Sequence, residues 1–153
     1  MKPQIFSSYN TALNEMLPLT PANQQHSEPK DFFIKKEGIH YAGTHLIIDL
    51  CEAENLDNLA LTEEALLTAV QEADATLLHI HLHHFEPNGG ISGVAVLAES
   101  HISVHSWPER GYAAFDVFMC GKAKPHRVLP VLKHYFRPQH VYINEQLRGA
   151  SII

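Results

Sequence analysis

Residues 76–120, TLLHIHLHHFEPNGGISGVAVLAESHISVHSWPERGYAAFDVFMC, decide the fold because they carry four strand patterns in succession and no helical one. The first ten residues alternate, with Leu78, Ile80 and Leu82 on one face and histidines on the other, which indicates a half-buried strand. Turn residues separate this strand from three more, expected at 92–99, 101–107 and 112–120. Four consecutive strands without a helix favour an antiparallel sheet.

The sequence on either side of this region adds two strands and two helices. A β-branched run at 44–50 predicts a strand, and residues 62–73 have the apolar spacing of a helix, with Thr62 as the expected N-cap. Residues 124–136 predict a second helix, and residues 140–147 predict a last strand. The order β-α-β-β-β-β-α-β predicts an α+β fold, a two-layer protomer with helices packed on one face of an antiparallel sheet.

The first 38 residues differ from the rest of the chain. They are rich in proline and polar side chains, so we expect an arm or partly ordered extension at 1–38 and one domain at 39–153. The start lacks an apolar stretch with a small-residue cleavage site, and no apolar run approaches the roughly 20 residues that span a bilayer. We therefore expect a cytoplasmic protein without a membrane segment.

The composition limits the partners that the chain could bind. Its 153 residues are 45% hydrophobic and 18% charged, which is typical of one globular domain. The formal net charge of -6 argues against binding to the phosphate backbone of a nucleic acid. Cys51 and Cys120 are the only cysteines, and in a reducing compartment we expect both to be free thiols.

The histidines of residues 79–84 suggest a metal site as one alternative. Side chains two apart on a strand are separated by about 7 Å, too far to close a tetrahedral zinc site without residues from other elements. Neither cysteine lies in a zinc-binding spacing. We therefore predict no metal ion, and a non-catalytic metal-binding protein using His79–His84 stays as an alternative function.

A hydrolase triad of Ser100, His105 and Asp116 is a second alternative. The G-x-S-x-G motif of nucleophile elbows is missing around Ser100, and the predicted context is strand to strand, not strand to helix. The spacing instead favours a hairpin that turns at 108–111 and brings Cys120 back beside Ser100. We expect Ser100, His105 and Cys120 to converge on one site.

Two segments carry a resemblance to a known family. GTHLIIDL (43–50) and HHFEPNGGISGVAVLAESHISVHSWPERGYAAFDVFMCG (83–121) resemble the prokaryotic S-adenosylmethionine decarboxylases, which are self-processing pyruvoyl enzymes. The resemblance covers roughly residues 38–150. It implies a lyase made as a zymogen, which cuts itself between Glu99 and Ser100 and converts Ser100 into the pyruvoyl cofactor that binds substrate as a Schiff base.

The same resemblance implies the reaction and the roles of further residues. The expected reaction converts S-adenosylmethionine to S-adenosylmethioninamine and CO2, which supplies the aminopropyl donor for spermidine. His105 would accept a proton during cleavage, Ser92 would hold the carbonyl oxygen, and Cys120 would donate a proton in turnover. The implied substrate contacts are Phe85, Trp107 and Glu109.

The resemblance also implies an assembly and leaves a close rival. In this family the site lies between the two protomers of a homodimer, so some residues would serve the neighbour's pyruvoyl group. The rival is a paralogous pyruvoyl-dependent arginine decarboxylase with the same processing chemistry. Trp107 and Glu109 argue for a nucleoside substrate instead.

Overall fold

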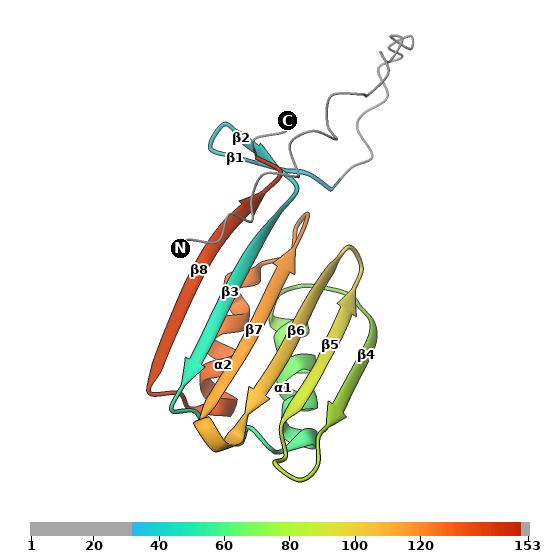
Figure 1. Ribbon diagram of the computed structural model, residues 1–153. Coiled ribbons are helices and arrows are strands. Elements are labelled where there is room, and N and C mark those ends of the chain that lie inside the picture. Colours follow the sequence, from blue (N-terminus) through green and yellow to red (C-terminus); the bar gives the residue numbers. More distant parts are fainter. Residues whose placement is uncertain (1–31, 151–153) are drawn as a thin grey trace, which may run out of the picture. The chain divides into compact units, whose positions relative to one another are not determined.

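The computed structural model describes residues 32–150 and contains a six-stranded antiparallel sheet with two helices on one face (Figure 1). The sheet order is β4-β5-β6-β7-β3-β8. Its strands are β3 (Gly43–Cys51), β4 (Leu77–His84), β5 (Ile91–Leu97), β6 (Ser100–Trp107), β7 (Tyr112–Met119) and β8 (His140–Arg148). The helices are α1 (Leu59–Glu72) and α2 (Val128–Phe136), and the 3-10 turns are η1 (Pro108–Arg110) and η2 (Pro125–Arg127). The predicted α+β class and element order from β3 to β8 are confirmed.

The core lies between the sheet and the two helices. Every second residue of the central strands is buried against α1 and α2, because successive side chains of a strand point to opposite faces. Phe115 of β7 meets Phe136 of α2 with ring centroids 5.6 Å apart. This packing leaves the opposite face of the sheet open.

A small hairpin precedes the main sheet. Strands β1 (Ile34–Lys36) and β2 (Ile39–Tyr41) pair with each other in an antiparallel two-stranded sheet. The hairpin thus begins within residues 1–38, which the sequence assigned to an extension. Residues 1–31 of that predicted extension lie outside the described residues.

Helix α1 begins three residues earlier than predicted. Asn58 is the N-cap, and its side-chain oxygen accepts the Leu61 N–H at 3.0 Å. Thr62 is buried inside the helix and donates its hydroxyl to the Asn58 carbonyl oxygen at 2.9 Å. The expected N-cap at Thr62 was wrong because Asn58, a strong capping residue, already satisfies the first free N–H groups.

A β-bulge changes the expected face of one residue in β4. The register shifts between Leu77 and His79, so Leu78 is left without a partner on β5. Leu78 is 64% exposed, and Leu77 packs against the core instead. The core face predicted for Leu78 was wrong, whereas Ile80 and Leu82 do pack against the core.

Across residues 32–150, no helix is both long enough and apolar enough to cross a membrane.

Candidate active site

The open face of the sheet carries histidines from four strands. Register places Val96, His101, Phe118 and His45 side by side across β5, β6, β7 and β3. The other histidines on this face are His79, His81, His83, His105 and His140. Within the part of the chain that the structure describes, no group of three His, Cys, Asp or Glu side chains is placed to hold a metal ion.

Ser100 and Cys120 form a contact at one end of this sheet. Ser100 begins β6 and is only 8% exposed, and its Oγ accepts the Cys120 N–H at 3.1 Å. Glu99, in the tight turn between β5 and β6, has a φ of 65°. This left-handed conformation costs a non-glycine residue about 1 kcal/mol. The bond between Glu99 and Ser100 therefore lies at a strained hairpin corner.

The Cys120 side chain is a free, half-buried thiol. Burial raises the pKa of this thiol, and the nearby negative charge of Glu99 raises it further. Both causes disfavour the thiolate, so the group keeps its proton at neutral pH and is able to act as a proton donor.

Ser92 and His105 form a second polar pair, at neighbouring positions of β5 and β6. The Ser92 Oγ and the His105 Nδ1 are 2.9 Å apart. The His105 ring also stacks near Trp107, with centroids 6.3 Å apart. His105 is exposed on the open face.

The two pairs lie far apart within one chain. Ser100 and His105 are five residues apart on β6, which at roughly 3.3 Å per residue separates them by about 16 Å. In Figure 1 the β5–β6 hairpin and the end of β7 lie at one end of the sheet, and η1 lies at the other. The predicted convergence of Ser100, His105 and Cys120 was therefore wrong for a single chain. The hairpin brings Cys120 to Ser100 and pairs His105 with Ala114 instead.

The three expected substrate contacts gather at the His105 end. Phe85 directly follows β4, and its ring meets the His83 ring edge-on with centroids 4.5 Å apart. His83 in turn pairs with Ser92 in the strand register. Trp107 ends β6 and is 40% exposed, and Glu109 is exposed in η1. Exposed aromatic rings beside an exposed carboxylate can bind a cationic nucleoside.

Tyr112 and Asp49 support the Trp107 ring, and the sequence did not reveal this contact. Tyr112 stacks on Trp107 with centroids 5.3 Å apart and donates its hydroxyl to the Asp49 Oδ1 at 2.6 Å. That hydrogen bond, followed by burial, raises the pKa of Tyr112 to about 12. The alternation in β7 predicted the face of Tyr112, but the pairing of β7 with the distant β3 gave no sequence signal.

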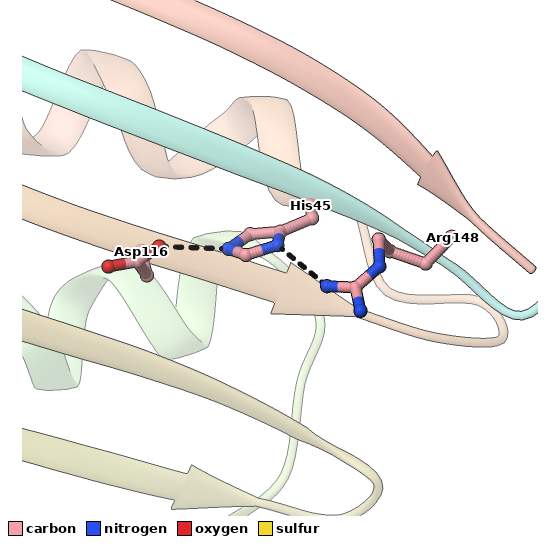
Figure 2. A network of polar contacts seen from close by, with 3 residues as sticks. All are labelled: His45, Asp116 and Arg148. Atoms are coloured by element: carbon pink, nitrogen blue, oxygen red, sulfur yellow. Dashed lines mark hydrogen bonds and ion pairs between the residues drawn. The ribbon is translucent and has the colours of Figure 1, made fainter. Parts of the chain in front are cut away.

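A network of three polar side chains crosses β8, β3 and β7 near the Ser100 end of the sheet (Figure 2). The His45 Nε2 lies 2.9 Å from the Asp116 Oδ1, and the Arg148 Nη1 lies 3.3 Å from the His45 Nδ1. Because the guanidinium can only donate, His45 carries its proton on Nε2 and donates it to Asp116. Asp116 is thus bonded to His45 and not to His105, which contradicts the hydrolase triad.

Comparisons with known proteins point to one family. The family model described as S-adenosylmethionine decarboxylase matches residues 44–149. An S-adenosylmethionine decarboxylase proenzyme of Thermomicrobium roseum is 45% identical, over 72% of this chain and 96% of the relative. A proenzyme of the same name from Methanococcus aeolicus is 44% identical, over 73% of this chain and 97% of the relative.

A solved structure shares the fold. The crystal structure of the adenosylmethionine decarboxylase from Aquifex aeolicus superposes with a TM-score of 0.65 at 32% identity, covering 71% of this chain and 92% of that one. The residues matched by the family model run from β3 to β8 and leave out the β1–β2 hairpin. Both polar pairs lie within the matched residues.

Proposed function

The chain belongs to the S-adenosylmethionine decarboxylase family, and we propose that it cuts itself between Glu99 and Ser100 to make a pyruvoyl cofactor. The mature enzyme is a carboxy-lyase that converts S-adenosylmethionine to S-adenosylmethioninamine and CO2. Its product supplies the aminopropyl donor for spermidine. The observation that carries the proposal is the Ser100–Cys120 contact at a strained corner, inside residues matched by the family model.

Cleavage starts with the Ser100 hydroxyl. Its Oγ attacks the carbonyl carbon of Glu99, the peptide C–N bond breaks, and an ester replaces the amide. The Cys120 N–H already donates to this Oγ, so it stabilises negative charge that develops there as the proton leaves. Loss of the Ser100 α-proton then breaks the Cβ–Oγ bond and leaves Glu99 as a carboxylate. Water replaces the remaining amine, ammonia leaves, and Ser100 becomes the pyruvoyl group.

The surroundings of Ser100 fit this small carbonyl group. Ser100 is buried at the start of a strand, and the hydrogen-bond donor at its side chain is a backbone N–H, which suits an oxygen acceptor. The pyruvoyl group supplies the carbonyl that binds the substrate amine and takes up the electrons released with CO2. The Cys120 thiol, protonated at neutral pH, donates a proton to the α-carbon of the substrate.

The second polar pair has the donors and acceptors that cleavage needs. When Nδ1–H of His105 donates to the Ser92 Oγ, the His105 Nε2 keeps its lone pair and can accept the α-proton of Ser100. The Ser92 hydroxyl then remains free to donate to the Glu99 carbonyl oxygen as charge develops on it. One pair thus supplies both the base and the oxyanion donor.

A homodimer brings the two pairs together. In a twofold dimer that packs the open faces head to tail, the His105 end of one protomer covers the Ser100 end of its partner. The separation of about 16 Å within one chain supports this arrangement, because neither end is complete alone. The open face and its ends also expose large apolar side chains that an interface would cover, namely Ile47, Phe85, Val96, Trp107 and Tyr142.

The test is intact mass combined with turnover. The wild-type protein should give two chains, residues 1–99 and 100–153, the second lacking a free amine, and should release CO2 from S-adenosylmethionine. Ser100→Ala should stay as one chain. A wild-type chain that stays full length after prolonged incubation would count against the proposal.

Three further assays test the substrate, the assembly and the location of the protein. Release of CO2 from arginine with none from S-adenosylmethionine would favour the paralogous arginine decarboxylase, although the exposed Phe85 and Trp107 rings support the nucleoside. Sedimentation should give a dimer mass. Cell fractionation tests the cytoplasmic location, which stays a prediction.

A further inference from the structure

The chain enters the fold next to the Cys120 turn, through a residue outside the family match. Phe32 precedes β1, and its carbonyl oxygen accepts the Gly121 N–H at 3.0 Å. The family model begins at residue 44, so this contact comes from a part of the chain that the family model does not cover. Phe32 therefore contacts the residue that follows the proposed proton donor.

The Cys120–Gly121 turn is held from two sides by backbone hydrogen bonds. On one side the Cys120 N–H donates to the Ser100 Oγ, and on the other the Gly121 N–H donates to Phe32. Consecutive N–H groups of one turn therefore bond to the cofactor precursor and to the N-terminal segment. A displacement of Phe32 would move the residue that follows the thiol.

The Phe32 ring adds a side-chain contact to the same turn. Gly121 has a φ of 60°, and a Cβ added there would lie 3.2 Å from the Phe32 Cδ1, so the ring rests against this glycine. Phe32 is 58% exposed, so only part of its ring packs against other residues. A cavity of about 250 Å³ also borders the turn, lined among others by Ile34, Gly121 and Ala123. With little packing on that side, the Phe32 contact has more influence on where the turn lies.

We propose that Phe32 is a positioning residue that holds the Cys120–Gly121 turn so that the thiol faces the reacting carbon at Ser100. This inference rests on the proposed function, because it assigns Phe32 a part in proton donation. Phe32 touches neither reacting atom and acts through Gly121. It predicts that a change at Phe32 alters the environment of the thiol and the rate of turnover, and leaves substrate binding, which depends on other residues, unchanged.

The test compares Phe32→Ala with Phe33→Ala in the full-length protein. Phe33 is the matched control because it is the adjacent phenylalanine and is 43% exposed. Phe32→Ala should lower kcat by about tenfold, a fraction of the hundredfold loss that a misplacement of roughly 1 Å can cause. KM should stay unchanged, and Phe32→Leu should recover most of kcat. A kcat for Phe32→Ala equal to that of Phe33→Ala would overturn the proposal.

Alkylation of the thiol provides a readout that does not depend on activity. Iodoacetamide labelling of Cys120, measured against pH by peptide mass spectrometry with Cys51 as internal reference, should be faster in Phe32→Ala and follow a lower pKa, because water reaches the loosened turn. The labelling of Phe33→Ala should match the wild type. An inactive wild-type protein would refute the proposed function alone, whereas identical labelling of both variants would refute the role of Phe32.

A double-mutant cycle with Gly121→Ala tests the contact itself. The added methyl group strains the backbone in any background, but it meets the Phe32 ring only when that ring is present. Gly121→Ala should therefore reduce kcat less in the Phe32→Ala background than in the wild type. Equal reductions in both backgrounds would show that Phe32 does not hold this turn.

Discussion

The two ends of strand β6 differ in burial and in the kind of group that they present. At its start, Ser100 is buried, and a backbone N–H donates to its hydroxyl. At its end, His105 and Trp107 are exposed on the open face. Chemistry that depends on a protonated thiol benefits from burial, whereas a base and a stacking ring that serve another chain must be accessible. This difference supports the proposal that each protomer carries two half-sites, which a second copy of the chain would join.

The largest effect on the exposed end is expected from His105→Ala. Because His105 is the proposed base that removes the Ser100 α-proton, its loss should slow cleavage by at least about a hundredfold, the typical contribution of a general base. The half-time of cleavage, followed by intact mass after synthesis, measures this change. Cleavage of His105→Ala at the wild-type rate would show that the exposed end of β6 does not supply the base.

At the buried end, Cys120→Ala should separate processing from turnover. Cleavage should proceed, because the Cys120 backbone N–H that contacts Ser100 is kept, while kcat should fall by about tenfold to a hundredfold with the loss of the proposed proton donor. Single-turnover kinetics of the cleaved variant measure this loss. A Cys120→Ala enzyme with full kcat would assign the proton to another group.

The pH dependence of kcat also tests the proposed role of the Cys120 thiol. Because burial and Glu99 raise the pKa of the Cys120 thiol, the group stays protonated through neutral pH and loses its proton only on the alkaline side. The wild-type kcat should hold through neutral pH and fall above the raised pKa. Cys120→Ala should lack that alkaline decline, and a decline of the same midpoint in both enzymes would contradict the assignment.

A smaller effect is expected from Tyr112→Phe, which keeps the ring on Trp107 and removes the hydrogen bond to Asp49. The free energy of unfolding should fall by about 1–2 kcal/mol, and KM should rise more than kcat falls. Because folding raises the pKa of Tyr112 from its ordinary 10 to about 12, its contribution is present below pH 10 and is lost between pH 10 and 12. Urea denaturation across that range should show a steeper loss in the wild type than in Tyr112→Phe.

The smallest effect is expected from a change that touches neither end. Lys124→Ala removes an exposed ion pair with Asp74, and such pairs contribute little in water. Cleavage, kcat and the urea midpoint should all stay at wild-type values. A large loss of cleavage in Lys124→Ala would show that the two ends do not account for the chemistry.

The local pattern of the sequence was enough to predict the elements and the faces of most strands. Alternation in β6 and β7 placed His105 and Asp116 on the open face, and the turn at 108–111 paired the two strands. The sequence did not reveal the bulge at Leu78, because one inserted residue changes the strand register while the alternation on either side looks normal. It also did not reveal the N-cap at Asn58, because a strong capping side chain moves the start of a helix without changing the spacing of its apolar residues.

The candidate site was harder to predict because it depends on long-range pairing and on distance along an extended strand. The pairing of β3 with β7 brings His45 to Asp116, 71 residues away in the chain, and no local pattern encodes that. Ser100 and His105 are also five residues apart on one strand, a separation of about 16 Å. Two residues of the same sequence motif are therefore not in contact. The resemblance groups Ser100, His105 and Cys120 in one site, which stays a prediction, whereas a single chain brings only Ser100 and Cys120 together.

In the proposed dimer, each site is built from the Ser100 end of one protomer and the His105 end of its partner. The direct test is co-expression of Ser100→Ala with a tagged His105→Ala chain, followed by intact mass of the co-purified heterodimer. The His105→Ala chain keeps Ser100, and its partner supplies His105. This chain should therefore be cut between residues 99 and 100 in the mixture and stay whole when it is expressed alone. A His105→Ala chain that stays whole in the co-purified heterodimer would contradict a site shared between two protomers.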